Sequence, residues 1–215
     1  MTAKSIQISK ASADEAVRFG PLIAGLIRAT GPVSYGYQFG GEGLLERMVA
    51  ASWNVPDTLF AASAATLATD GDEMLGMELG FAGPNFYVFK DNLVALAGGL
   101  IAEGVVSFDE LKGLAERAEQ ASYLNAHVPE DVYYLHALST PERHRGKGVG
   151  RQLLHAAITR AKADGYRELQ LDVLADNPAV GFYQANGLRI LCETRSPNLS
   201  RDHGFPSEYR MAVTL

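Results

Sequence analysis

The chain has 215 residues, of which 47% are hydrophobic and 20% are charged, and its formal net charge is −6. This composition is typical of a globular protein and argues against disorder, and the length fits a single domain over residues 1–215. Because nucleic-acid binders present a basic face to the phosphate backbone, the acidic balance argues against a nucleic-acid partner.

The sequence also argues against a membrane partner. The longest apolar stretch, residues 93–106, contains Glu103 and is too short to span a bilayer. The first residues lack the apolar core of a signal peptide, so we expect a cytoplasmic protein. The single cysteine, Cys192, lies in an apolar run and is interpreted as a buried small hydrophobic residue.

The N-terminal part of the chain predicts one strand and two helices. Weak alternation over residues 5–9 favours a strand. Ser12 followed by Glu15 is a capping-box pattern, which predicts a helix over residues 15–29. Residues 44–53 predict a second, shorter helix that ends before a proline.

Residues 31–43 combine five glycines with the aromatic residues Tyr35, Tyr37 and Phe39. One interpretation is a connecting loop with its aromatic side chains tucked beneath it. The other is a mobile loop whose aromatic side chains form walls of an acceptor pocket. The sequence leaves both open.

Two apolar runs, residues 59–66 and 74–81, flank the turn sequence Asp70-Gly71-Asp72 and predict an antiparallel hairpin. Residues 85–128 then show helical spacing of leucines and predict a helical hairpin, with a cap at Ser107. This hairpin is too apolar for a linker. We expect it to pack on the rest of the domain or on a second subunit. In the second case the protein would be a homodimer.

The second half of the chain alternates strands and helices. Strands are expected at 132–138, 168–174, 188–193 and 208–215, and helices at 149–164 and 177–186, with a polar loop at 194–207. The strand at 132–138 is followed by a basic, glycine-rich turn that opens a helix. Backbone N–H groups and the positive end of the helix dipole meet there, which favours a pyrophosphate-bearing ligand.

Two common phosphate-binding patterns do not fit this turn. A Walker A loop needs glycine where Pro141 stands and Ser or Thr where Gly148 stands. A dinucleotide-binding loop needs a third glycine where Arg151 stands. The remaining pattern is R-x-x-G-x-G, formed by Arg145, Gly148 and Gly150.

This pattern, within Arg145-Gly-Lys-Gly-Val-Gly-Arg-Gln-Leu-Leu, resembles the acyl-CoA-binding motif of the GNAT superfamily of N-acyltransferases. Downstream, Leu171-Asp-Val-Leu-Ala-Asp-Asn-Pro-Ala-Val-Gly-Phe-Tyr-Gln-Ala-Asn-Gly-Leu is similar to the second motif of that family. The resemblance implies an α/β (α+β) fold with a mixed, mostly antiparallel twisted sheet flanked by helices. The helical hairpin at 85–128 departs from it and is expected as an insertion before the central strand.

The resemblance also implies the residues that bind coenzyme A. The backbone amides of the glycine-rich turn would bind the pyrophosphate, while the end of the central strand and Asn177 would contact the pantetheine arm. The implied cofactor-binding residues are Leu138, Ser139, Arg145, Gly146, Lys147, Gly148, Val149, Gly150, Arg151, Asn177 and Tyr183.

Three residues are candidates for catalysis. Tyr183 stands where the family often places the acid that protonates the departing thiolate. For the base that deprotonates the acceptor, His136, Glu78 and a water chain remain alternatives.

The sequence therefore predicts transfer of an acetyl group from acetyl-CoA to a primary amine by direct attack, with no metal. The acceptor would be a small molecule or a peptide. The alternatives are a CoA-binding sensor or structural subunit without turnover, and an acyltransferase that uses a longer acyl donor or a hydroxyl acceptor.

Overall fold

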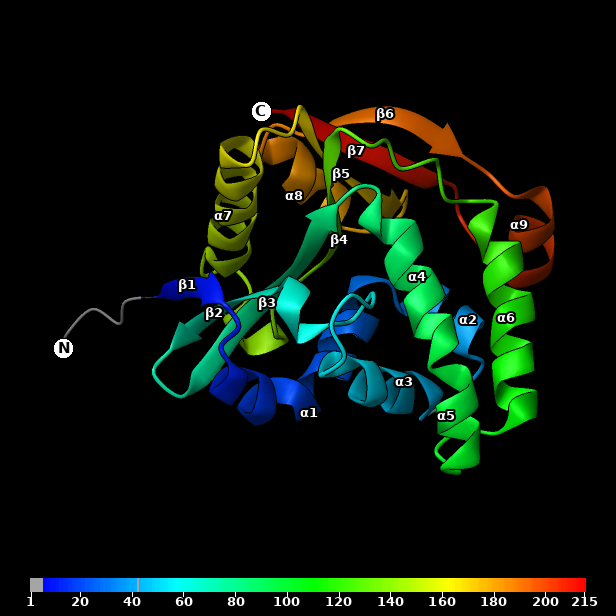
Figure 1. Ribbon diagram of the computed structural model, residues 1–215. Helices are drawn as coiled ribbons and strands as arrows, with labels where there is room; N and C mark the ends of the chain where they lie inside the picture. The colour runs from blue at the N-terminus through cyan, green and yellow to red at the C-terminus, as the bar shows by residue number, and fades with distance from the viewer. Residues whose placement is uncertain (1–5, 42) are drawn as a thin grey trace.

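A computed structural model describes residues 6–41 and 43–215. Within these residues, seven strands form one open sheet in the order β1-β2-β3-β4-β5-β7-β6 (Figure 1). Neighbouring strands are antiparallel except for the central pair of β4 and β5. The strands are β1 (Gln7–Lys10), β2 (Ala65–Asp70), β3 (Glu73–Ala82), β4 (Val132–Ser139), β5 (Glu168–Leu174), β6 (Arg189–Thr194) and β7 (Glu208–Thr214).

Helices cover both faces of the sheet because its strands bury side chains in two directions. On β4, Tyr134 joins the core that contains α1, whereas Tyr133 packs in the core that contains Leu154 of α7. The helices are α1 (Ala13–Thr30), α2 (Pro32–Phe39), α3 (Leu44–Trp53), α4 (Asn85–Ala95), α5 (Ala97–Ala102), α6 (Phe108–Ser122), α7 (Val149–Ala163), α8 (Ala179–Ala185) and α9 (Pro197–His203), with 3-10 turns η1 (Ala62–Ala64) and η2 (Glu142–His144).

The expected mixed, mostly antiparallel sheet flanked by helices is confirmed. Both capping boxes form: Ser12 with Glu15 at the start of α1, and Ser107 with Glu110 at the start of α6. The hairpin of β2 and β3 turns at Gly71, which has a φ of 59°. These features depend on short-range sequence signals, which explains why the sequence predicts them well.

Three expected elements differ in the structure. Strand β2 begins at Ala65 rather than at residue 59, because Phe60 and Ala61 are buried as part of an irregular segment before η1. Residues 32–39 form helix α2, which has a proline in its first turn and ends at Gly40 with a φ of 66°. The polar loop at 194–207 contains helix α9.

The interpretation of Cys192 as buried is wrong, because the residue is exposed. It lies on β6, the last strand of the sheet, which has a neighbour on one side only. Residues 189–193 of this strand are all exposed. An apolar run on an edge strand therefore resembles a core strand in the sequence.

Residues 85–128 are mainly helical, as expected, and form α4, α5 and α6 along one side of the molecule (Figure 1). They pack on the rest of the chain, since Phe89, Leu100 and Val106 belong to the same core cluster as the buried residues of α1. The assignment of residues 1–215 to a single domain stays a prediction.

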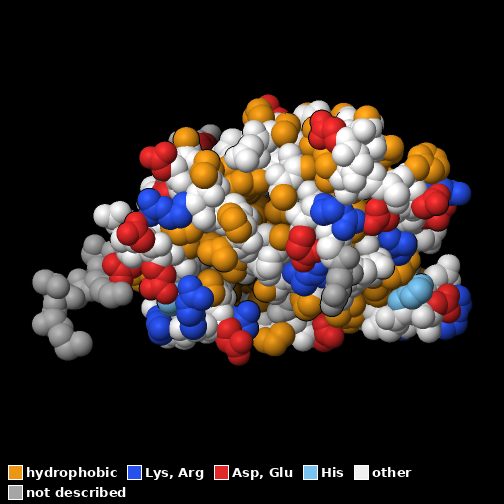
Figure 2. Space-filling view, turned by 90° about the horizontal axis from the view of Figure 1, so that it is seen from below, with side chains coloured by type: hydrophobic (Ala, Val, Ile, Leu, Met, Phe, Trp, Pro, Cys, Tyr) orange, Lys and Arg blue, Asp and Glu red, His pale blue; other side chains and the backbone are white. Residues whose placement is uncertain are grey.

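Within residues 6–41 and 43–215, no helix is long and apolar enough to cross a bilayer. On the face seen from below, Lys and Arg side chains are interspersed with Asp and Glu (Figure 2). That face therefore has no broad basic area of the kind that a phosphate backbone requires.

Candidate active site

The site is built where the two central strands separate. Strands β4 and β5 pair from Val132 with Glu168 to Tyr134 with Gln170, and beyond that point the described residues form no further β4–β5 pairs. A cleft of about 890 Å³ opens between their carboxyl ends, and residues 135–140 line it. The two strands therefore splay apart, which leaves backbone groups of β4 facing the cleft.

The glycine-rich turn forms one end of this cleft. Gly146 and Gly148 have φ values of 74° and 80°, a conformation that residues with a Cβ adopt at a cost. Gly148 is the N-cap of α7 and provides no side-chain hydrogen bond, so the first N–H groups of the helix stay available. Arg145, Gly146, Gly148, Val149, Gly150 and Arg151 line the cleft.

The charge at this end comes from two arginines. Arg145 donates to the carbonyl of Thr140, and Arg151 donates to the side chain of Asn186. Lys147, expected to add charge, is exposed and is not among the residues that line the cleft. Backbone amides, a helix N-terminus and guanidinium groups together form a donor set suited to a pyrophosphate.

Helix α8 provides another wall of the cleft, with Tyr183 and Asn177. Tyr183 is buried, and burial holds the pKa of its hydroxyl well above the usual value of 10.0. Asn177 accepts a hydrogen bond from the N–H of Ala179, and its amide donates to the carbonyl of Thr30. The N-cap of α8 is Pro178, one residue after the expected start at residue 177, and the Asn177 side chain ties the start of α8 to the end of α1.

His136 lies at a bulge in β4, between the residues that pair with Leu79 and Gly80 of β3. Its Nε2 atom is buried and has no hydrogen-bond partner among the residues that the structure describes. Burial lowers the pKa of the imidazole from 6.5 to about 4, so the ring is neutral at pH 7. His136 and Tyr134 line the same cavity because alternate residues of a strand share one face.

Glu78 lies away from this region. It is fully buried on β3, where it binds Arg160 of α7 at 2.8 Å and accepts a hydrogen bond from Tyr133, also at 2.8 Å. It lines neither the cleft nor the cavity next to it. The geometry therefore supports a structural ion pair for Glu78 and disfavours it as the base that deprotonates the acceptor.

A second cavity, of about 300 Å³, adjoins the cleft. Both are lined by Thr30, Gly31, His136, Asp172, Val173, Leu174 and Asn177, so they meet where β4 and β5 separate. Tyr35 and Phe39 of α2 line this cavity, in keeping with the pocket-wall interpretation of residues 31–43. Tyr37 does not, since its ring packs against His203 and Phe205.

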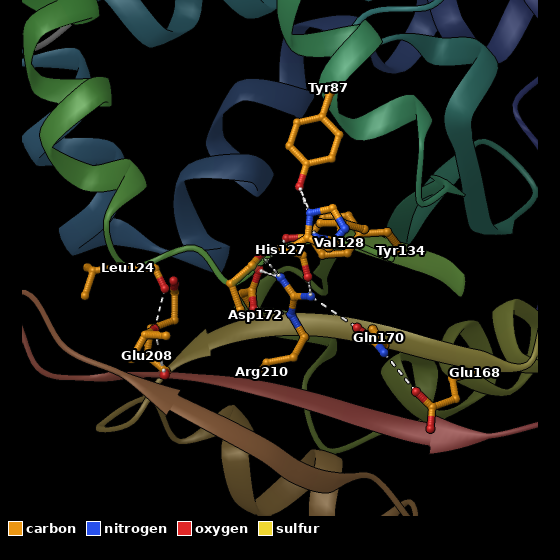
Figure 3. Close-up of polar contacts among 12 residues, drawn as sticks. Tyr87, Leu124, His127, Val128, Tyr134, Glu168, Gln170, Asp172, Glu208 and Arg210 are labelled. Carbon is orange, nitrogen blue, oxygen red and sulfur yellow. Dashed lines mark hydrogen bonds and ion pairs between the residues drawn. The ribbon is translucent and has the colours of Figure 1, made fainter. Parts of the chain in front are cut away.

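Sequence reasoning missed the charged groups of the second cavity. Arg210 of β7 binds Asp172 of β5 through two hydrogen bonds, and Asp172 also accepts one from the Tyr134 hydroxyl (Figure 3). Glu208, the first residue of β7, lines the cavity as well. In the sequence, Asp172 alternates with apolar neighbours, a pattern that does not distinguish a buried ion pair from a solvent-facing side chain.

The described residues contain no group of three or more His, Cys, Asp or Glu side chains that could hold a metal ion.

The sheet opens between two parallel strands, and a helix N-terminus with a glycine-rich turn lies at the opening. This arrangement suits an extended cosubstrate that carries a pyrophosphate. The model of the acetyltransferase (GNAT) family matches residues 58–188. That match covers more than half of the chain, and the protein therefore belongs to the GNAT acetyltransferase family. Its class of chemistry is acyl transfer.

Solved structures share the fold at low sequence identity. An N-acetyltransferase from Staphylococcus aureus Mu50 has a TM-score of 0.70 and 14% identity, over 96% of this chain and 100% of that one. A mosquito arylalkylamine N-acetyltransferase like 5b has a TM-score of 0.59 and 16% identity, over 98% and 100%. A chain of the NatC complex bound to Gag peptide and CoA has a TM-score of 0.55 and 12% identity, over 98% and 99%. No curated protein matches the sequence.

Proposed function

We propose that this enzyme transfers an acetyl group from acetyl-CoA to a primary amine by direct attack of the amine. The observation that carries this proposal is the junction of two cavities at the separated strands β4 and β5. One cavity leads to the glycine-rich turn and the other is enclosed mainly by apolar side chains. A donor and an acceptor entering from opposite sides would meet at this junction.

In this proposal the donor lies along the cleft. The amides from residue 145 to residue 151 and the guanidinium groups of Arg145 and Arg151 bind the pyrophosphate. The free backbone edge of Leu138 and Ser139 pairs with the amides of the pantetheine arm. Acetyl-CoA supplies the acetyl group as a thioester, and Asn177 forms the wall where the arm would enter the junction.

The transfer forms one C–N bond and breaks one C–S bond. The ammonium group of the acceptor loses one proton before attack and a second as the amide forms, so one proton reaches the thiolate and one is released to solvent. The Tyr183 hydroxyl lines the cleft and is protonated at pH 7, which suits it to donate the proton that the thiolate takes up.

His136 is the candidate proton acceptor that the geometry favours over Glu78. It lines both cavities, its ring is neutral at pH 7, and its Nε2 atom is free to accept a hydrogen bond from the amine or from a water that contacts it. Its lowered pKa makes it a weak base, so a water chain from the amine to solvent stays part of the proposal.

Direct attack is favoured over a covalent acyl-enzyme because the chain has one cysteine, and it lies outside the site. Cys192 is exposed on the edge strand β6 and does not line the cleft. Membership of the GNAT acetyltransferase family supports an amine acceptor. Consistent with it, one structural neighbour is an arylalkylamine N-acetyltransferase and another was solved with a peptide.

Isothermal titration with acetyl-CoA tests the donor site. Wild type is expected to bind, and Gly148→Glu is expected to lose binding by at least about tenfold because a carboxylate would stand at the phosphate site. Gly165→Glu is the matched control: Gly165 follows the other end of α7, has a φ of 83° against 80° for Gly148, and both have open space around a Cβ. Backbone strain is therefore similar in the two variants, and only Gly148 lines the cleft.

Thiol release over a panel of amines tests turnover. Release that depends on an amine supports acetyl transfer, whereas acetyl-CoA binding with no turnover on any amine would support the CoA-binding sensor instead. Absence of acetyl-CoA binding to wild type would overturn the proposal as a whole.

A further inference from the structure

The second cavity, here called the acceptor-side cavity, has walls that are mainly apolar. Many of its aromatic and aliphatic side chains come from α2, from the segment before β2, and from helices α4 and α6. They include Phe39, Phe60, Phe86, Leu93, Leu111 and Leu114. A cavity of about 300 Å³ lies at the lower end of the range for small-molecule pockets, which favours a compact ligand.

The charged groups of this cavity are not equivalent. Both oxygens of Asp172 are occupied, since Oδ1 accepts from Arg210 and Oδ2 accepts from Arg210 and from the Tyr134 hydroxyl. The charge of Asp172 is thereby balanced by Arg210. Lys90, which also lines the cavity, is exposed and lies at its rim.

Glu208 has no such partner. Its Oε2 atom is buried and accepts no hydrogen bond from the described residues. Glu208 lies beside the Asp172–Arg210 pair, and its backbone is fixed by pairing with Leu174 at the end of β5 (Figure 3). Leu174 and Asp172 line both cavities, so Glu208 is next to the junction. A buried carboxyl group that lacks a partner is costly unless a ligand supplies one.

A ligand with a cationic group on an apolar body would match both the unpartnered polar atoms of the cavity and its apolar walls. The Oε2 atom of Glu208 and the Nε2 atom of His136 are buried and have no hydrogen-bond partner among the described residues. An ammonium group carries three N–H donors, and a neutral imidazole with its proton on Nδ1 accepts through Nε2. The remaining walls would contact hydrocarbon. A polyamine would instead leave further charges against apolar side chains, and a peptide would leave unpaired amide groups there.

We propose that the acceptor is a primary amine on a compact aliphatic or aromatic body, and that its ammonium group pairs with the carboxylate of Glu208. This inference rests on the proposed acetyl transfer and narrows its acceptor. In this arrangement Glu208 binds and orients the amine at the junction, while the hydrocarbon body lies between α2, α4 and α6. Burial raises the pKa of Glu208 to about 8 in the free enzyme, and an ammonium group beside it lowers that pKa, so the side chain ionises as the amine binds.

The first experiment compares acceptors for the wild-type enzyme by thiol release. The panel contains 2-phenylethylamine, hexylamine, spermidine and an unblocked Ala-Gly-Gly tripeptide. We expect kcat/KM for the two apolar amines to exceed that for spermidine and for the tripeptide by at least about tenfold. A preference for spermidine or for the tripeptide would overturn the inference while leaving acetyl transfer intact.

The second experiment examines Glu208 with the preferred amine. Glu208→Gln is expected to lower kcat/KM by about 100-fold, mainly through a higher KM, and Glu208→Asp is expected to restore part of it. The control is Glu193→Gln, because Glu193 is exposed on β6 and lines neither cavity. If Glu208→Gln keeps kcat/KM within about twofold of wild type, Glu208 does not bind the amine.

A third variant separates the two cavities. Ala118 of α6 lines the apolar cavity but not the cleft, so Ala118→Trp is expected to exclude the amine and leave acetyl-CoA binding unchanged by titration. Retained turnover of 2-phenylethylamine in this variant would contradict the assignment of the cavity. Failure of wild type to bind acetyl-CoA would overturn the proposed function itself, a result distinct from a change in acceptor preference.

Discussion

Removal of the Arg160 guanidinium tests whether Glu78 is a structural anion. Glu78 is fully buried and is held by Arg160 and by the Tyr133 hydroxyl. Arg160→Met keeps an unbranched apolar stem but leaves a buried carboxylate with one neutral donor. Such a change costs about 3–5 kcal/mol. Because the charge of Lys10 also interacts with Glu78, we expect the lower end of that range, about 3 kcal/mol.

Urea unfolding measures this loss directly, and in a chain of this size it corresponds to a fall in Tm of roughly 6–12 °C. Arg167→Met is the control, because Arg167 and Asp131 pair at the surface with side-chain exposures of 64% and 56%. It is expected to cost less than about 1 kcal/mol. A loss below about 1 kcal/mol for Arg160→Met would refute the reasoning. Glu78→Gln should keep the turnover of its folded fraction, and a large loss there would return Glu78 to the mechanism.

Three further predictions concern the site. Tyr183→Phe should lower kcat by about 100-fold and leave acetyl-CoA affinity unchanged by titration, and unchanged turnover would remove Tyr183 from the mechanism. Burial, together with the charge of Asp172, raises the pKa of Glu208 from 4.5 to about 8, so its contribution to stability is complete below pH 4.5 and is lost toward pH 8. Glu208→Gln should therefore gain roughly 2–4 kcal/mol relative to wild type between about pH 5 and pH 8 in urea unfolding, and a constant difference would contradict the raised pKa. Burial lowers the pKa of His136, so its contribution is present above pH 6.5 and is lost as pH falls toward 4. As pH falls from 6.5 to 4, the free energy of unfolding should decrease less for His136→Phe than for wild type. Parallel pH profiles of the two proteins in urea unfolding would refute this.

The parts of the fold that the sequence predicts are those determined over short distances along the chain. Ser107 and Glu110 specify the start of α6 because the two side chains bond each other's backbone three residues apart. The glycine-rich turn is recognisable for a similar reason, since Gly148 both allows the required backbone conformation and leaves the helix N-terminus open.

The charged groups of the acceptor-side cavity depend instead on sheet register. Arg210 meets Asp172 because β7 pairs antiparallel with β5 in the register that places these residues opposite each other. The same register places Glu208 opposite Leu174, next to the junction. Thirty-eight residues separate the members of the ion pair, and no local pattern encodes that pairing. Helix α2 was missed for another reason. The five glycines of residues 31–43 are typical of a loop, but only Gly36 lies inside the helix, whose first turn contains a favourable proline.

The exposed position of Cys192 gives the protein a built-in attachment point for a spectroscopic probe. The sequence contains one cysteine, and it lies on the edge strand β6, outside both cavities. A maleimide dye would therefore modify one defined position without occupying either substrate path. A fluorophore on this strand, which pairs with the β7 strand that carries Glu208, would allow ligand entry to be followed in the wild-type sequence, with no engineered thiol.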